Sequence, residues 1–183
     1  MDTNFDVIVI GGGIMGCSSA YRIAQRGMKV AVIEKAGLGN GSTGRSSAII
    51  RQHYSNELTA KMAHHSLRVF QNFGDEVGGE SGFTVAGFLV LTPEKDLEGL
   101  KANVALQQSV GIKTGLLSRD ELAERWPYLE IGDLVAAAYE PESGYADPAL
   151  TVNSFAQAAK GRDRKSTRLN SSHSQQSRMP SSA

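Results

Sequence analysis

The hydrophobic pattern at the start of the chain predicts a strand, a helix and a second strand. Apolar residues run almost without interruption from Phe5 to Ile10, which is typical of a strand buried on both faces. After three glycines, apolar residues recur every three or four positions over 14–26, as in an amphipathic helix. A second apolar run follows over 29–34. A strand–helix–strand unit within about 30 residues indicates a parallel sheet with a right-handed crossover.

The rest of the body alternates between helical and extended patterns. Ser118 and Glu121 form a capping box at the start of one helix, which Pro127 ends. Asp147 is a candidate N-cap, and Pro148 suits the first position of the helix that follows. Strands are expected within 81–92, with a hairpin or bend at Gly87, and within 133–148. The predicted further helices cover 58–73, 93–111, 118–126 and 147–160. The expected fold class is therefore α/β.

The composition limits the class of protein to which the chain can belong, but it does not identify a function. The chain has 183 residues, of which 40% are hydrophobic and 21% charged, and its formal net charge is zero. These values suit a globular domain, and the neutral charge gives no reason to expect a nucleic-acid partner. We see no signal peptide and no apolar run of the roughly 20 residues that span a bilayer. The single cysteine, Cys17, excludes an intramolecular disulfide and favours a cytoplasmic location.

The last 21 residues differ from the body of the chain. Residues 163–183 hold seven serines, four Lys or Arg and almost no apolar side chain. Such a segment buries too little surface to offset the entropy of ordering it, so we predict that it is disordered. The stretch "RKSTRLNSSHSQ" is similar to a translated sequencing adaptor. We therefore predict that this tail is not native, and we exclude it from the fold.

The glycine-rich turn between the first strand and the first helix is a candidate phosphate site. Gly11, Gly13 and Gly16 have the spacing G-x-G-x-x-G, which brings backbone N–H groups and a helix N-terminus close to a pyrophosphate. Glu34 ends the second strand, 18 residues beyond Gly16, where an acid accepts hydrogen bonds from a ribose. The glutamate argues against the 2′-phosphate of NADP. It does not distinguish FAD from NAD.

A second motif, "STGRSSAIIR" over 42–51, favours FAD. Together with "ERWPYL" and "EPESGYADPALTVNSFAQAA", it resembles the D-amino-acid-oxidase-like (DAO) family of FAD-dependent oxidoreductases. Within that family the chain is most similar to the group of sarcosine oxidase β-subunit, dimethylglycine dehydrogenase and glycine oxidase. The resemblance covers Asp6 to about Gly161. It implies a Rossmann-like βαβ FAD-binding domain with part of an α+β substrate domain.

The resemblance also implies which residues contact the cofactor. Ser42 and Thr43 offer hydroxyl groups to the pyrophosphate or ribitol, and Arg45 supplies positive charge near the flavin. The segment from Ser46 to Ile49 lines the isoalloxazine ring. A solvated turn for the serines and a surface ion pair for Arg45 are the plainer alternatives. The predicted cofactor-binding residues are Gly11, Gly13, Ile14, Gly16, Glu34, Lys35, Ser42, Thr43, Arg45, Ser46, Ser47 and Ile49.

Two further residues are candidates for catalysis. By resemblance Arg51 lies near the flavin, where its guanidinium can pair with a substrate carboxylate in a bidentate manner. His53 can donate to the flavin or tune its potential. The alternative for each is a structural role. No cluster in the sequence suggests a metal site.

The family's chemistry is the oxidation of a C–N bond in a small amine or amino acid, with hydride transfer to the flavin. We expect residues 1–80 to form the first part of the FAD-binding domain, 81–146 a partial substrate domain, and 147–162 a helix that returns to the FAD-binding domain. Family members are about twice as long, so we expect a fragment that binds FAD weakly and is inactive alone. The resemblance also allows a hetero-oligomer. An NAD-dependent oxidoreductase and a noncatalytic dinucleotide-binding fragment remain as alternatives.

Overall fold

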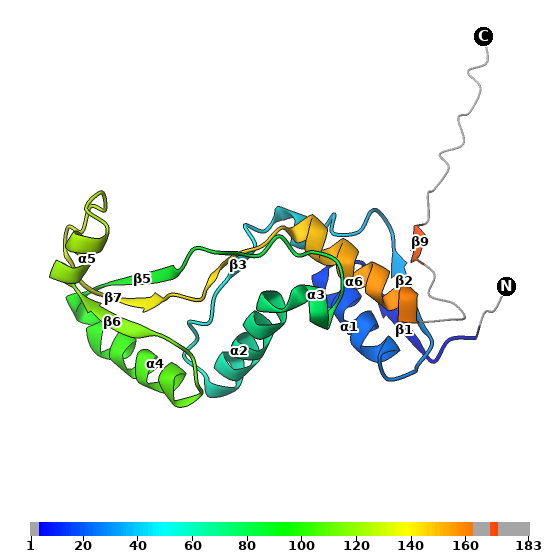
Figure 1. Ribbon diagram of the computed structural model, residues 1–183, viewed down its shortest axis with the longest axis horizontal. Helices are drawn as coiled ribbons and strands as arrows, with labels where there is room; N and C mark the ends of the chain where they lie inside the picture. Colours follow the sequence, from blue (N-terminus) through cyan, green and yellow to red (C-terminus); the bar gives the residue numbers. More distant parts are fainter. Residues whose placement is uncertain (1–3, 163–168, 172–183) are drawn as a thin grey trace, which may run out of the picture. The chain divides into compact units, whose positions relative to one another are not determined.

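The computed structural model describes residues 4–162 and 169–171, and these form two compact units (Figure 1). The first unit combines residues 4–46 with 148–162 and 169–171, and the second covers 47–147. The boundaries between the two units therefore lie between residues 46 and 47 and between residues 147 and 148. The functional domain boundaries expected at 80 and 146 stay a prediction.

The first unit contains the strand–helix–strand unit that the sequence predicts. β1 and β2 pair in parallel, with Val7 opposite Val30 and Ile10 opposite Ile33, and β9 adds a parallel strand beside β2. The helix between β1 and β2 ends two residues earlier than expected. The elements of this unit are β1 (Val7–Ile10), α1 (Ile14–Ala24), β2 (Val30–Glu34), the 3₁₀ turn η1 (Thr43–Arg45), α6 (Pro148–Arg162) and β9 (Leu169–Ser171).

The core of the first unit lies where α1 and α6 pack together beside the sheet (Figure 1). Tyr21 is fully buried, and its ring lies 5.7 Å from that of Phe155. Small residues such as Ala20 and Ala156 face the same interface and let the two helix backbones approach. α6 comes from the far end of the sequence, so the first unit depends on a long-range contact.

The expectation that β1 is buried on both faces is wrong. Val7 and Val9 are half-buried, whereas the side chains of Ile8 and Ile10 are 60% and 86% exposed. Successive side chains of a strand point to opposite faces, so the described residues bury one face of β1 and leave the other exposed. A continuous apolar run indicates that both faces suit burial, but it does not say what covers them.

The second unit is built on antiparallel sheets. β3, β8 and β4 form a short sheet, and β5, β7 and β6 form a longer one with β7 in the centre. Its elements are β3 (Ile49–Ile50), α2 (Glu57–Gln71), α3 (Phe73–Glu76), β4 (Thr84–Val85), β5 (Phe88–Pro93), the 3₁₀ turn η2 (Glu94–Asp96), α4 (Leu97–Ser109), β6 (Gly115–Ser118), α5 (Arg119–Arg125), β7 (Leu134–Glu140) and β8 (Gly144–Tyr145).

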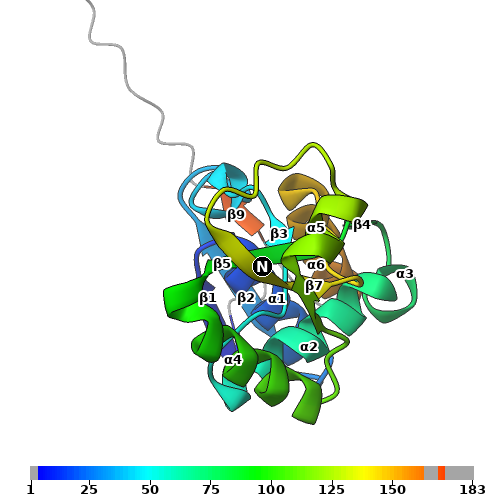
Figure 2. The same ribbon diagram turned by 90° about the vertical axis from the view of Figure 1, so that its left-hand side faces the viewer.

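Two helices cover opposite faces of the β5–β7–β6 sheet (Figure 2). Leu100 and Val104 of α4 pack on Ala138, whereas Leu122 of α5 packs on Ala137. Ala137 and Ala138 are neighbours on β7 and therefore point to opposite faces. Small side chains on the central strand allow both helices to lie close to the sheet.

Most of the expected helices are confirmed. The capping box is present, since the Ser118 hydroxyl accepts from the Glu121 N–H at 3.3 Å and the Glu121 carboxylate accepts from the Ser118 N–H at 2.8 Å. Gly87 adopts φ +75° between β4 and β5, but the expected hairpin is not formed, because β4 pairs with β8 and β5 pairs with β7. β6 was not predicted, because its four residues are too few to show a period.

The described residues include no helix that is long and apolar enough to cross a membrane. The tail expected to be disordered and non-native, 163–183, lies outside the described residues except for 169–171, which form β9. That expectation stays a prediction.

Replacing Ser118 with alanine should lower the free energy of unfolding by about 1 kcal/mol, because the first turn of α5 loses its cap. Urea unfolding followed by the fluorescence of Trp126, the only tryptophan and the residue directly after α5, measures this. Ser66→Ala is the matched control, because Ser66 is exposed within α2 and, among the described residues, its hydroxyl bonds only to the Met62 carbonyl. Equal effects of the two substitutions would contradict the cap's role.

Candidate functional site

The glycine-rich turn is shaped by a close approach between α1 and the end of β1. A β-carbon on Gly16 would lie 1.9 Å from the Gly11 carbonyl oxygen, so only glycine fits there. Gly11 adopts φ +103°, which favours glycine, and its N–H donates to the Ile33 carbonyl at 2.8 Å. The turn therefore fixes the N-terminus of α1 just beyond the end of the parallel strands.

The first turn of α1 has no side-chain cap of its own. Gly13 occupies the N-cap position, and the Ile14 N–H donates instead to the hydroxyl of Thr43 at 3.1 Å. A β-carbon on Gly13 would lie 3.0 Å from the same hydroxyl. The first N–H groups of a helix have no partner within it and attract anions. The structure thus brings together Gly13, Ile14 and Thr43, as the sequence predicts.

Glu34 closes the other side of the turn. Its carboxylate accepts from the Gly12 N–H at 2.7 Å and from the Ala36 N–H at 2.9 Å. These backbone donors, Gly12 first, lower the pKa of Glu34 below its usual range and keep it ionised. A carboxylate has about four lone-pair positions, so both oxygens can still accept from ribose hydroxyls.

A loop over 37–46 lies against the glycine-rich turn. The Gly39 N–H donates to the Gly12 carbonyl at 3.0 Å, and the Gly44 N–H donates to the Gly39 carbonyl at 2.7 Å. Gly39 and Gly44 were not singled out in the sequence; the density of glycine over 36–46 was the available signal. The loop borders a pocket of about 240 Å³, lined by Leu38, Gly39, Asn40, Gly44, Arg45, Pro148 and Ala149.

The remaining predicted cofactor residues fall into two groups. Lys35, Ser42, Arg45 and Ser46 are exposed and belong to the first unit, with Arg45 lining the pocket. The others belong to the second unit. These are Ser47, which is exposed, and Ile49, which pairs with Tyr145 between β3 and β8.

The arrangement in the first unit suits the diphosphate and adenosine ribose of a dinucleotide. Among the described residues, no atom lies within 4 Å of the Gly11 Cβ position and only the Thr43 hydroxyl lies within 4 Å of that of Gly13, so a side chain would fill the space that the turn keeps open. Backbone donors at the start of α1 face this space, and an ionised acid lies at the end of β2. These residues fit FAD, which would supply a hydride acceptor.

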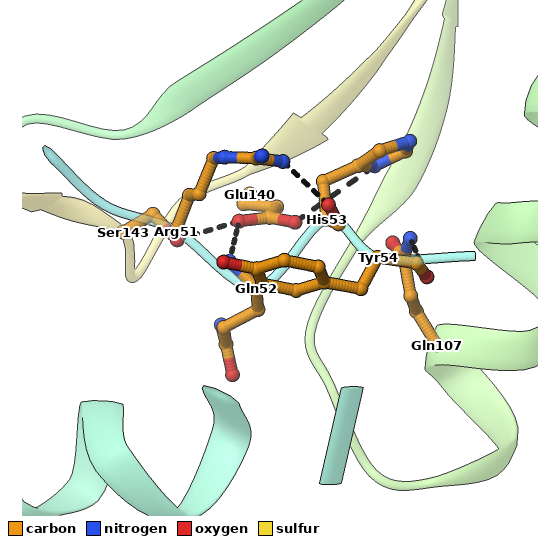
Figure 3. A network of polar contacts seen from close by, with 7 residues as sticks. All are labelled: Arg51, Gln52, His53, Tyr54, Gln107, Glu140 and Ser143. Carbon is orange, nitrogen blue, oxygen red and sulfur yellow. Dashed lines mark hydrogen bonds and ion pairs between the residues drawn. The ribbon is translucent and has the colours of Figure 1, made fainter. Parts of the chain in front are cut away.

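The second unit holds the two predicted catalytic residues on one turn after β3 (Figure 3). The Arg51 guanidinium donates to the His53 carbonyl at 2.5 Å and lies over two aromatic rings, 4.8 Å from the Tyr54 centroid and 5.7 Å from that of Phe88. Within the described residues, no carboxylate pairs with Arg51. Arg51 is therefore a half-buried cation with no anionic partner in this part of the chain.

His53 lies beside a buried acid that the sequence analysis missed. Glu140, at the end of β7, is fully buried and accepts from the Gln52 N–H at 2.8 Å and from the Ser143 hydroxyl at 2.6 Å. Its other oxygen lies 3.9 Å from His53 Nδ1. Burial lowers the pKa of His53, the Glu140 charge raises it, and the Arg51 charge lowers it further, for a net decrease. His53 is therefore neutral at neutral pH.

A second histidine supports the same turn. His64 Nδ1 lies 2.8 Å from the Gln52 side-chain oxygen, and Arg68 donates to His64 Nε2 at 3.3 Å. Burial is the main cause that lowers the pKa of His64. Because Nε2 accepts, the proton is on Nδ1 and donates to Gln52. Gln107 in turn donates to the Tyr54 carbonyl at 3.2 Å.

Comparisons with known proteins agree with this geometry. The chain is 30% identical to human mitochondrial sarcosine dehydrogenase over 160 residues, which are 86% of this chain and 17% of that protein. It is 32% identical to the mitochondrial pyruvate dehydrogenase phosphatase regulatory subunit of Mus musculus over 155 residues, which are 84% of this chain and 18% of that protein.

A solved structure shares the fold. The crystal structure of L-proline dehydrogenase from P. horikoshii superposes with a TM-score of 0.83 at 32% sequence identity, over 93% of this chain and 45% of that one. The chain thus spans less than half the length of each of these three relatives.

The family profile described as "FAD dependent oxidoreductase" matches residues 6–165. This match decides between FAD and NAD in favour of FAD, as the motif over 42–51 predicts. It also agrees with the glycine-rich turn, Glu34 and Thr43 at the candidate site. The chain belongs to the DAO family of FAD-dependent oxidoreductases.

Proposed function

We propose that this chain provides the FAD-binding turn and part of the substrate site of an enzyme that oxidises a C–N bond. The substrate would be a small secondary or tertiary amine or amino acid of the sarcosine or glycine type. The observation that supports the proposal is the turn formed by Gly11, Gly13 and Gly16, with Thr43 on the first N–H of α1 and Glu34 opposite. FAD would accept the hydride that leaves the carbon next to the nitrogen.

Arg51 is the proposed contact for the substrate carboxylate. Its guanidinium is fixed by the His53 carbonyl and two aromatic rings, and no carboxylate among the described residues neutralises it. Guanidinium binds carboxylate through two parallel N–H groups, which orients as well as attracts the anion. Sarcosine and proline, named in two relatives, are both secondary amines with a carboxylate on the adjacent carbon.

A noncatalytic role is the second candidate, because one relative at 32% identity is a regulatory subunit. In such a protein the glycine-rich turn would hold FAD or another dinucleotide for stability or signalling. Flavin reduction by an amine, measured with this chain completed to the length of its relatives, separates the two candidates, since only the enzyme transfers a hydride.

The location and partners of the chain are further expectations. The single cysteine favours a cytoplasmic location, although two relatives are named as mitochondrial. Assembly with a different subunit, which the family resemblance allows, also remains a proposal.

Gly13→Ala should weaken FAD binding, because the added methyl group occupies the surface that the diphosphate approaches. Loss of one or two charge-assisted hydrogen bonds corresponds to a roughly tenfold to hundredfold weaker affinity. Titration of FAD with the purified chain, followed by quenching of flavin fluorescence, gives the affinity. Gly99→Ala is the control, since Gly99 is exposed within α4 and its Cβ position is open. The proposal fails if the wild type does not bind FAD, or if both variants bind it equally well.

Arg51→Met should weaken the recognition of small carboxylates. In the ¹⁵N-labelled chain, sarcosine and acetate should shift the Arg51 Nε–H resonance, whereas methylammonium, which has no carboxylate, should not. The substitution should weaken binding roughly tenfold or more, again because a charge-assisted pair is lost. Arg119→Met is the matched control, because Arg119 is exposed and, within the part of the chain that the structure describes, donates only to the Leu134 carbonyl. Unchanged carboxylate binding by Arg51→Met would show that the anion site lies elsewhere.

A further inference from the structure

Glu140 is a buried carboxylate with one unused oxygen. Its side chain has no exposed surface, and both of its hydrogen bonds, from the Gln52 N–H and the Ser143 hydroxyl, go to Oε2. Oε1 is buried and has no hydrogen-bond partner in the part of the chain that the structure describes. A buried acceptor without a donor is unfavourable, so Oε1 requires a donor close by.

His53 presents the complementary atom. The residue is only 9% exposed, and its Nδ1 is likewise buried and has no hydrogen-bond partner among the described residues. Nδ1 and Oε1 lie 3.9 Å apart and face each other, while the other ring nitrogen points away from Glu140 (Figure 3). A small rotation of either side chain brings the two atoms within hydrogen-bond distance.

We propose that Glu140 is a positioning residue that holds His53, on the turn that also carries Arg51, as the Nδ1–H tautomer and leaves Nε2 as a proton acceptor. As a carboxylate Glu140 can only accept, so the donor across the 3.9 Å contact is Nδ1–H. The hydrogen bond at one ring nitrogen decides the protonation of the other. This inference deepens the proposed function and rests on it for the nature of the substrate.

The lowered pKa of His53 is consistent with a neutral ring that can take up a proton. The charged groups that influence it come from two elements, Arg51 on its own turn and Glu140 on β7. Arg51 opposes protonation and Glu140 favours it, so uptake of a proton at Nε2 would create an imidazolium that faces the carboxylate. The opposing effects of Arg51 and Glu140 thus allow the His53 ring to change between its neutral and its protonated state.

A proton acceptor at this position meets a specific need of amine oxidation. An amino acid carries a protonated amine at neutral pH, and its nitrogen is one carbon away from the carboxylate that Arg51 would bind. Transfer of one proton breaks an N–H bond of the ammonium group and forms Nε2–H on His53. The freed lone pair of nitrogen would then favour loss of a hydride, with its two electrons, from the adjacent carbon, for which bound FAD would supply the acceptor.

The tautomer of His53 is measured directly in the ¹⁵N-labelled protein without flavin or substrate. Long-range ¹H–¹⁵N spectra distinguish a protonated ring nitrogen from an unprotonated one, and His53→Gln identifies the signals. We expect a protonated Nδ1 and an unprotonated Nε2. The reverse tautomer would overturn the proposal. Because no ligand is present, failure here is distinguishable from failure of the proposed amine oxidation.

Glu140→Gln provides the sharper test, because it should reverse the tautomer. The donors Gln52 N–H and Ser143 O–H both require an acceptor at Oε2, so the amide oxygen takes that place. The amide NH₂ then faces His53 Nδ1 and donates to it, which moves the ring proton to Nε2. The loss of the negative charge should also lower the pKa of His53. An unchanged tautomer and an unchanged pKa would overturn the proposal.

Two controls keep the test decisive. Ser143→Ala removes a donor to Oε2 but leaves Oε1 facing the ring, so the Nδ1–H tautomer of His53 should persist. His64 serves as an internal reference, because Arg68 already fixes its tautomer. If Glu140→Gln fails to fold, the wild type and Ser143→Ala still decide, since a protonated Nε2 in either overturns the proposal.

Discussion

The candidate cofactor site depends on how closely the backbone of α1 approaches the end of β1. Gly16 lies so near the Gly11 carbonyl that a single β-carbon would come within 1.9 Å of its oxygen. This contact sets the direction of α1, and α1 in turn provides both the N–H donors of the turn and the surface on which α6 packs. Cofactor binding and the core of the first unit therefore rest on the same backbone contact.

The second unit is organised around a buried charge rather than a turn. Glu140 ends the central strand of a sheet and binds the backbone of the turn that carries Arg51 and His53. The acid is separated from that turn by 88 positions in the sequence, so the geometry of the turn is set by tertiary structure. A buried carboxylate is costly unless it is paired, which suggests that its contribution is to specify this arrangement.

The sequence predicts features that local chemistry determines. The capping box at Ser118 is local, and it is present. Exposure of Ile10 was mispredicted, because an apolar run does not show what covers each face of a strand. Glu140 was missed for a related reason. In the sequence, Glu140 is the first residue of "EPESGYADPALTVNSFAQAA", a motif that supported the family resemblance. Only the fold shows that it lies beside His53.

The most direct test of the account is to map where FAD contacts the chain. Titration of FAD into the ¹⁵N-labelled protein should shift the backbone amides of Gly11–Gly16, Glu34 and Thr43–Arg45 first and most strongly. The glycine-rich turn, Glu34 and the 3₁₀ turn η1 bring these backbone groups close together. Saturable binding with its largest shifts away from these residues would show that the glycine-rich turn is not the dinucleotide site.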